Sequence, residues 1–164
     1  MTESTDAAPQ PTGSPAYLAG LLLHGRRVVV VGGGRVAARR VPKLVAAGAR
    51  VDLVSPDAAP VLRDLADAGT LAWQRRGFTA SDLDGAWYVL ATTDSAEVNA
   101  EVATQAEQRH TFCVRADHAD AGSAWTPATG ETSGATVAVV TSHDPLRARR
   151  IRDRFVEVIA EEAL

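Results

Sequence analysis

A glycine-rich turn, Gly32–Gly34, carries the strongest chemical signal in the sequence. It follows the valine run Val28–Val31 and precedes an apolar-periodic segment, so it joins a buried strand to a helix. In the pattern G-x-G-x-x-A, Gly32 permits the tight turn, Gly34 lets a phosphate approach the backbone, and Ala37 lets the helix pack closely on the strand. The free N–H groups of the helix N-terminus attract a pyrophosphate. The turn predicts a dinucleotide site, and a purely structural βα turn is the alternative.

Polar residues also follow the second expected strand, Arg50–Ser55. Ser55, Pro56 and Asp57 are therefore candidates for cofactor binding, because ligands of such sheets bind at the carboxyl ends of the strands. Asp57 is either a ribose contact or an acid in the first turn of the next helix. The strand does not end in Asp or Glu, and no Arg follows at once to favour a 2′-phosphate. Since Asp57 can still reach the ribose, we expect NAD rather than NADP.

The fourth and fifth expected strands end in further candidates. Thr92, Thr93 and Asp94 lie where the nicotinamide half of a dinucleotide should pass, and they also suit capping of the following helix. Asp117 follows the strand Thr111–Ala116. A carboxylate beside a nicotinamide can accept the proton that is released as a hydride departs, so Asp117 is the catalytic candidate. A turn-forming aspartate is the alternative interpretation.

Alternating strands and helices must position these residues. The expected strands are Arg26–Val31, Arg50–Ser55, Thr70–Arg75, Ala86–Ala91 and Thr111–Ala116. The expected helices are Arg35–Ala47, one that opens at Ser55-Pro56-Asp57 and runs to about Ala68, a short turn at Ser81–Asp84, and one that opens at a capping box of Asp94 and Glu97 and runs to about Arg109. This alternation predicts an α/β fold with a doubly wound, parallel, five-stranded sheet of Rossmann type.

The two ends of the chain differ from this region. Residues 1–16 are polar and contain three prolines, which predicts a disordered tail before an NAD-binding domain at residues 17–117. Residues 118–164 are expected to form a β-ribbon from Gly122–Ala128 and Thr136–Thr141, followed by a helix, Leu146–Ala163. A two-stranded ribbon is marginally stable alone, so this region is expected to pair with a second copy and form a homodimer.

Composition excludes several classes of protein. The net charge of -3 disfavours a nucleic-acid binder, and no apolar run is long enough to span a membrane. The N-terminus lacks an export signal, and the single Cys113 cannot form an internal disulfide, so we expect a reducing, cytoplasmic location. Cys and His residues show no zinc spacing, and we expect no metal site.

Five segments together carry a resemblance to a known family. They are VVVVGGGRVAARR (28–40), AGARVDLVSP (47–56), VLATTDSAEVN (89–99), FCVRADHADAGSAWTPA (112–128) and TVAVVTSHDP (136–145). The chain resembles the N-terminal part of siroheme synthase, the precorrin-2 dehydrogenase and sirohydrochlorin ferrochelatase family. Many dinucleotide-binding proteins share the glycine turn, whereas ATTD…VN followed by FC…D…P is much more specific.

The resemblance implies NAD-dependent oxidation of precorrin-2, a tetrapyrrole, to sirohydrochlorin, and in many members insertion of ferrous iron. It places the key aspartate at Asp117 and a phosphorylated hydroxyl residue at Thr141. It also places dinucleotide contacts at Arg35, Val36, Pro56 and Asp57. The sequence departs from the family at 141–145, where Thr-Ser-His-Asp-Pro replaces a glycine-containing loop and leaves the backbone less free. Two other functions fit the residues: an NAD-sensing regulatory module without turnover, and an unrelated NAD(P) oxidoreductase.

Overall fold

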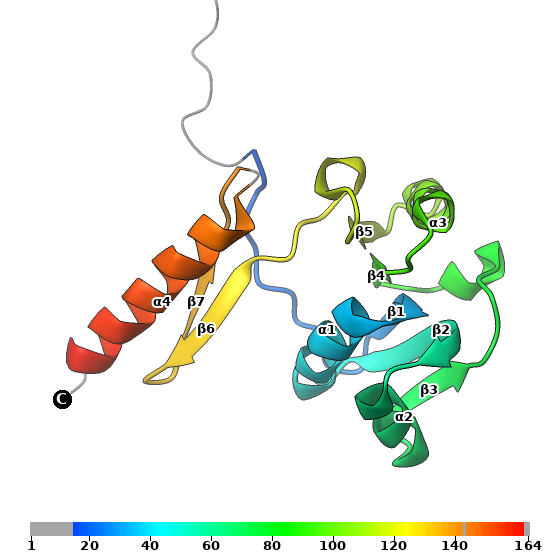
Figure 1. The fold of residues 1–164 in the computed structure, drawn as a ribbon, viewed down its shortest axis with the longest axis horizontal. Helices are drawn as coiled ribbons and strands as arrows, with labels where there is room; N and C mark the ends of the chain where they lie inside the picture. Colours follow the sequence, from blue (N-terminus) through cyan, green and yellow to red (C-terminus); the bar gives the residue numbers. More distant parts are fainter. Residues whose placement is uncertain (1–14, 143, 163–164) are drawn as a thin grey trace, which may run out of the picture. The chain divides into compact units, whose positions relative to one another are not determined.

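The computed structural model describes residues 15–142 and 144–162 (Figure 1). It divides into two compact units, one of residues 20–125 and the other combining 126–164 with 1–19, within the described part. The disordered tail predicted at residues 1–16 falls almost entirely outside the described residues.

The larger unit contains a parallel five-stranded sheet, which confirms the predicted fold class. Its strands are β1 (Arg27–Gly33), β2 (Arg50–Ala58), β3 (Leu71–Gln74), β4 (Tyr88–Ala91) and β5 (Phe112–Arg115). They are ordered β3-β2-β1-β4-β5, so the chain crosses over between β3 and β4 from one edge of the sheet to the other half. Val31, Ala91 and Arg115 lie in register at the carboxyl ends of β1, β4 and β5. These ends form the edge to which the candidate site residues belong.

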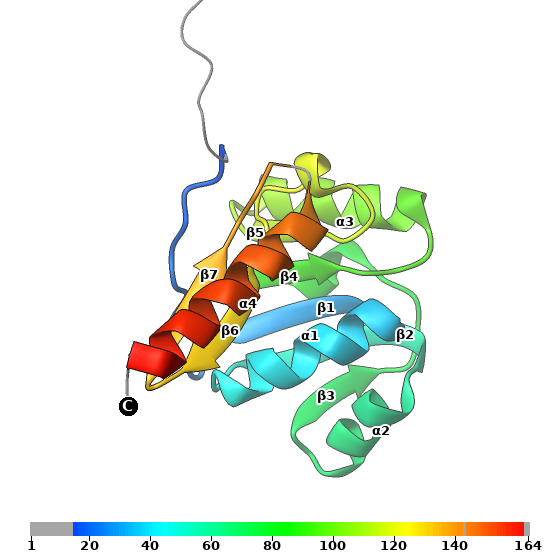
Figure 2. The same cartoon turned by 60° about the vertical axis from the view of Figure 1, so that its left-hand side comes forward.

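Helices cover both faces of this sheet (Figure 2). They are α1 (Arg35–Ala46), α2 (Pro60–Asp67) and α3 (Ala96–Gln108), with short 3₁₀ turns η1 (Ala80–Leu83) and η2 (Ala119–Ala121). Val28 and Val30 pack with residues of α1 and α2, whereas Val29 and Val31 pack with residues of α3. The valine run is buried throughout because β1 is covered on both sides, as in other parallel sheets.

The predicted helix start at Ser55-Pro56-Asp57 is wrong. β2 continues to Ala58, and α2 begins at Pro60. A register shift after Val31 lets Gly33 pair with Ala58, and the N–H of Ala59 donates to the Gly33 carbonyl at 2.8 Å. The glycine turn therefore supplies backbone partners that keep this segment extended. A proline in the first turn was the right signal, but Pro60 rather than Pro56 fills that position.

The predicted capping box of Asp94 and Glu97 is also wrong. The N-cap of α3 is Ser95, whose hydroxyl accepts a hydrogen bond from the N–H of Val98 at 3.2 Å. Asp94 lies one residue too early and is exposed. A genuine capping box occurs instead in η1, where Thr79 and Asp82 cap each other, at the short turn expected near Ser81–Asp84.

Asp82 is expected to stabilise the folded state, and the size of this contribution should depend on pH. Its carboxylate accepts bonds from both terminal nitrogens of Arg76 at 2.5 and 2.8 Å and from the N–H of Thr79 at 2.8 Å. These bonds, led by those from Arg76, lower the pKa of Asp82 from 3.8 to about 2. A carboxyl whose pKa is lower in the folded state stabilises above its unfolded pKa and loses that contribution as pH falls through the folded value.

We therefore expect Asp82→Asn to lower the free energy of unfolding at pH 7 by about 2 kcal/mol. The wild-type protein should lose this increment between about pH 4 and pH 2, whereas the variant should show a flatter pH dependence in that window. Urea unfolding at a series of pH values measures both quantities. Equal pH slopes for the two proteins would contradict the assignment.

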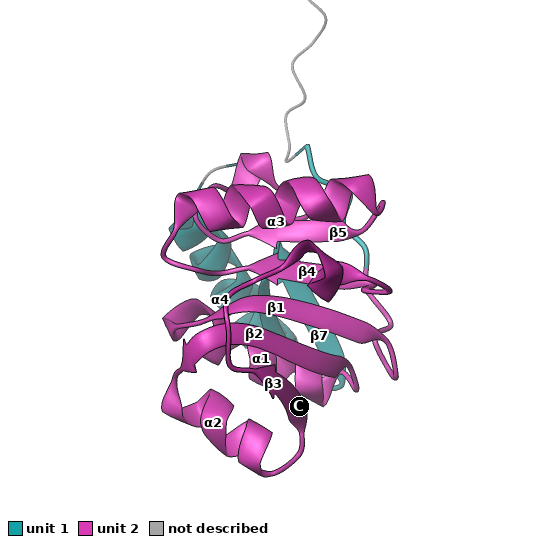
Figure 3. Cartoon of the chain, turned by 90° about the vertical axis from the view of Figure 1, so that its right-hand side faces the viewer, with its two compact units in different colours: residues 1–19, 126–164 teal, residues 20–125 magenta. Residues whose placement is uncertain are grey.

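The smaller unit, coloured teal in Figure 3, is an antiparallel ribbon with a helix packed on it. Its strands are β6 (Ala128–Thr132) and β7 (Ala135–Val139), and the helix is α4 (Pro145–Glu162). Ser133 and Gly134 both have positive φ angles, of 48° and 77°, as a two-residue hairpin turn requires. A side chain on Gly130 would meet Arg152 and Val156 at 2.6 and 2.7 Å, so this glycine permits the close approach of α4.

The predicted first ribbon strand, Gly122–Ala128, is wrong except for its last residue. This segment instead returns to the outer edge of β5. The N–H of Ser123 donates to the carbonyl of Cys113 at 2.9 Å, and its hydroxyl accepts from the N–H of Cys113 at 2.9 Å. The segment thus satisfies backbone groups of an edge strand. No helix in the described residues has the length and apolar character needed to cross a membrane.

Candidate functional site

Gly32, near the end of β1, packs closely against the start of the loop that follows β4. Its φ is +101°, and a Cβ there would lie 2.7 Å from the backbone of Thr92 and of Thr93. The Thr92 hydroxyl donates to the carbonyls of Val31 at 3.0 Å and Gly32 at 3.1 Å, and Thr92 is buried. Both the conformation and the space exclude any other residue at position 32. Gly32 and Thr92 together hold the glycine turn against the segment that follows β4.

Ser55 supports the glycine turn from the β2 side. Its hydroxyl accepts a hydrogen bond from the N–H of Gly33 at 2.9 Å, and the side chain is buried. A Cβ on Gly33 would lie 2.3 Å from the carbonyl oxygen of Asp57, so the middle glycine is also required by close packing. The structure thus places Ser55 beneath the turn, where it holds the turn in position.

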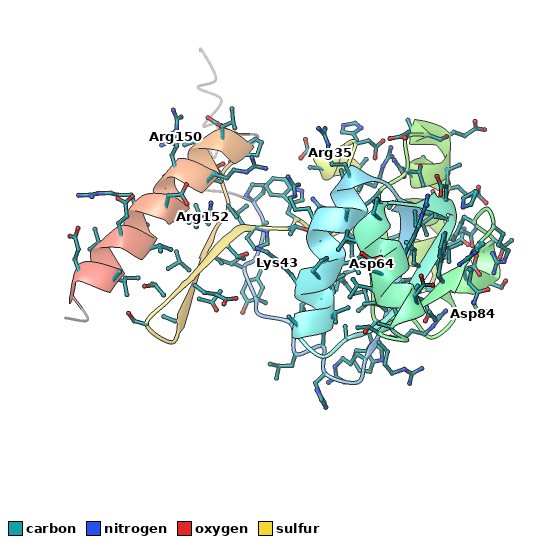
Figure 4. The ribbon with its side chains drawn as sticks, turned by 60° about the horizontal axis from the view of Figure 1, so that its bottom comes forward. Arg35, Lys43, Asp64, Asp84, Arg150 and Arg152 are labelled. Atoms are coloured by element: carbon teal, nitrogen blue, oxygen red, sulfur yellow. The ribbon has the colours of Figure 1, made fainter. Side chains whose placement is uncertain are left out.

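The N-terminal end of α1 fits a pyrophosphate. Gly34 is the N-cap, is exposed, and has open space where a Cβ would lie. No side chain caps this helix, and its first turn contains no acid. Arg35 is exposed at the start of the helix (Figure 4), and Val36 is half-buried. The backbone N–H groups and the helix dipole are therefore available to an anion, which is the chemistry that an NAD pyrophosphate requires.

Asp57 is displayed at the end of β2, with its side chain 83% exposed. One carboxylate oxygen accepts from the N–H of Ala58 at 2.8 Å and from Arg63 at 2.6 Å. The Ala58 hydrogen bond, followed by the charge of Arg63, lowers the pKa of Asp57. Pro56 is exposed beside it. Arg63 was not predicted near this site, because it lies in the next helix rather than directly after the strand.

Asn99, a fully buried residue of α3, organises the loop after β4. Its side-chain oxygen accepts from the N–H of Thr93 at 3.0 Å and from the Thr93 hydroxyl at 2.8 Å, and its amide donates to the Thr93 carbonyl at 3.0 Å. No role was predicted for Asn99, although it is the last residue of the family-like segment VLATTDSAEVN (89–99). A buried polar residue directly after the helix start is the signal that could have identified it.

Asp117 lies just beyond β5, with its side chain 27% exposed. Arg115 donates to both of its oxygens, at 2.5 Å from Nη2 and 3.3 Å from Nε. The hydrogen bonds from Arg115 are the main cause that lowers the pKa of Asp117. Arg115 also donates to the carbonyl of Ala96, the first residue of α3, at 3.4 Å, so it connects Asp117 to the start of the helix that follows the Thr93 loop.

Other predicted residues lie outside this edge. Thr141 is half-buried, and its hydroxyl donates to the carbonyl of Asp144, but it belongs to the smaller unit. Within residues 15–142 and 144–162, no group of three or more His, Cys, Asp or Glu side chains is placed to hold a metal ion. Cys113 is buried, which raises the pKa of its thiol to about 11.

The fold and this polar edge define a Rossmann-type dinucleotide-binding protein. In agreement, a family model described as "Putative NAD(P)-binding" matches residues 20–128, which include the glycine turn, the Thr93 loop and Asp117.

The relatives define the family more narrowly. A siroheme synthase of Chromobacterium violaceum is 40% identical over 140 residues, which is 85% of this chain and 30% of that protein. A precorrin-2 dehydrogenase of Bacillus subtilis is 33% identical over 120 residues, covering 73% of this chain and 74% of that one. The solved structure of SirC, precorrin-2 dehydrogenase, is similar with a TM-score of 0.77 and 25% identity, covering 87% of this chain and 70% of that one. The chain belongs to the precorrin-2 dehydrogenase and siroheme synthase family.

The chain spans about three tenths of the length of the siroheme synthases that it matches. The family resemblance, the fold class and an NAD(P)-type cofactor, which the sequence analysis predicted, are thereby confirmed.

Proposed function

We propose that this chain oxidises precorrin-2 to sirohydrochlorin with NAD, and that Asp117 is its catalytic residue. The observation that carries the proposal is the placement of the Asp117 carboxylate just beyond β5, where Arg115 holds it and also donates to the carbonyl of Ala96, directly after the Thr93 loop. That loop is the one locked to the glycine turn by Gly32 and Thr92. The names and extent of the relatives support the same activity.

Cofactor binding is assigned to three groups of residues. The pyrophosphate would lie against Gly32, Gly34, Arg35 and Val36. The adenosine half would be supported or contacted by Ser55, Pro56 and Asp57. The nicotinamide half would be bordered by Thr92, Thr93 and Asp94. Bound NAD supplies a hydride acceptor. The preference for NAD over NADP rests on Asp57, because its exposed carboxylate at this strand end can bind ribose hydroxyls and also neutralises Arg63, the nearby cation that could otherwise bind a 2′-phosphate.

The role of Asp117 is to receive a proton. Oxidation of precorrin-2 removes two hydrogens: one leaves its carbon as a hydride, with the bonding electron pair, and the other leaves as a proton. The Asp117 carboxylate accepts that proton and passes it to solvent, which its partial exposure allows. Since Arg115 lowers the pKa of Asp117, the base is ionised at neutral pH.

Three further assignments are proposed: a homodimer, ferrous iron as a second substrate and a cytoplasmic location. Leu146 and Phe155 of α4 are 66% and 54% exposed, which supports a homodimer through the ribbon and helix. Ferrous iron is proposed as a second substrate on the family resemblance, with Asp117 receiving pyrrole protons as the metal enters. The single buried Cys113 supports a reducing cytoplasmic location.

Mixing the purified chain with NAD and precorrin-2 tests the proposed activity. We expect the sirohydrochlorin absorption spectrum to appear together with one equivalent of NADH. Binding of NAD without turnover would overturn the proposal in favour of a sensing module. Turnover of a different substrate by the same site would favour another class of oxidoreductase.

A further inference from the structure

Asp117 and its neighbour Arg115 form a two-point ion pair at the end of β5. Two donor nitrogens of one guanidinium face the two oxygens of one carboxylate, at 2.5 and 3.3 Å. The Arg115 side chain is only 10% exposed, although it ends in a charged group. Paired, two-point contacts of this kind fix direction as well as distance.

We propose that Arg115 is a positioning residue that fixes the orientation of the Asp117 carboxylate for proton transfer. This inference rests on the proposed function of Asp117. Asp117 lies in the loop beyond β5, so the sheet does not hold its side chain directly. Arg115 is the last residue of β5, is in register with Ala91 of β4, and donates a second, longer bond to the carbonyl of Ala96 at 3.4 Å. The guanidinium of Arg115, which is anchored in the sheet, thus restricts the orientation of the Asp117 side chain in the loop.

The surroundings of the pair make Arg115 the main electrostatic influence on Asp117. Asn99, from α3, is neutral and is only the smallest cause of the lowered pKa of Asp117. Arg115 also borders a surface hollow of about 460 Å³, whose wall includes the acids Glu107 of α3 and Asp120 of η2. His118 follows Asp117 in the same loop and is exposed. Among the groups that act on Asp117, the hydrogen bonds from Arg115 are the largest cause of its lowered pKa.

Removing Arg115 should raise the pKa of Asp117 and change the pH dependence of activity in a predictable direction. The lowered pKa of Asp117 keeps the carboxylate ionised to lower pH, so activity that needs the ionised base should persist there. In Arg115→Gln the pKa of Asp117 should rise, and the acid limb of the pH–rate profile should move to higher pH. At neutral pH, where Asp117 stays ionised, a loss of kcat would then report lost orientation.

The test compares Arg115→Gln, Arg115→Lys and the control Arg109→Gln. Arg109 forms a similar Arg–Asp pair, with Asp84 at 3.0 Å, near the opposite ends of the strands. We expect Arg115→Gln to lower kcat at pH 8 by about 10- to 100-fold, with the KM for NAD unchanged. Arg115→Lys should restore part of the loss, since it keeps the charge without the two-point contact. Arg109→Gln should behave like the wild type.

A carboxyl ¹³C NMR titration, with the Asp117 signal assigned by its absence in Asp117→Asn, measures the same effect without substrate. A higher pKa of Asp117 in Arg115→Gln than in the wild type supports the inference, and an unchanged pKa and unchanged pH–rate profile overturn it. If the wild type does not oxidise precorrin-2, the proposed function fails, while the titration still decides the role of Arg115. Should Arg115→Gln not fold, Arg115→Met, which also removes the charge and the hydrogen bonds, carries both measurements.

Discussion

Asp117→Asn is expected to reduce turnover of precorrin-2 by about 10² to 10⁴-fold. Asparagine has nearly the same shape as aspartate but cannot accept the proton that leaves the macrocycle. Because Asp117 is not part of the glycine turn or the α1 N-terminus, the affinity for NAD should stay within about twofold of the wild type. Steady-state kinetics gives the turnover, and isothermal titration calorimetry gives the NAD affinity.

The matched control is Asp84→Asn. Asp84 is also paired with an arginine in the larger unit, but it lies before β4, at the amino ends of the strands. It should retain wild-type turnover. Full activity of Asp117→Asn would exclude Asp117 as the proton acceptor, and a parallel loss of NAD affinity would instead assign it to cofactor binding.

Gly32→Ala is expected to have the largest effect on the fold and on cofactor binding together. The added Cβ would lie 2.7 Å from the backbone of Thr92 and Thr93, at a φ of +101°. Backbone atoms cannot rotate away, so the β1 and β4 loops must separate. Combining the cost of overpacking with that of the conformation gives a loss of about 2 to 5 kcal/mol in the free energy of unfolding. Urea denaturation measures this loss.

Substitutions at two other glycines distinguish the effect of the positive φ angle from the effect of the added methyl group. Gly69 has a φ of +69° with open space around it, so Gly69→Ala carries the conformational cost without the collision. It should lose about 1 kcal/mol and retain NAD binding. Gly34→Ala adds a methyl group in open space, so it should fold normally yet weaken NAD binding about 10- to 100-fold by obstructing the pyrophosphate. Normal NAD binding by Gly34→Ala would remove the pyrophosphate from that position.

The sheet could be predicted from the sequence because each strand is a short apolar or β-branched run between turn residues. The failures occurred where long-range pairing decided the local structure. Pro56 and Asp57 look like a helix start. However, Gly33 pairs with Ala58 and its carbonyl accepts from the N–H of Ala59, and this pairing holds the segment as a strand. Segment 122–128 looks like a ribbon strand, but its first residues instead pair with Cys113 at the edge of β5.

The candidate site was only partly predictable for the same reason. Gly32, Thr92 and Asp117 lie at strand ends, and the alternation of strands and helices is enough to bring such ends together. Asn99 and Arg115 act through hydrogen bonds to residues that topology alone does not place next to them. Their roles depend on side-chain orientation, which spacing in the sequence does not determine.

The most direct test is a crystal structure of the chain with NAD and sirohydrochlorin bound. We predict that the pyrophosphate lies against the glycine turn and that the macrocycle is held between the nicotinamide ring and the Asp117 carboxylate. A dinucleotide bound away from the carboxyl ends of β1 and β4, or a macrocycle out of reach of Asp117, would contradict this account.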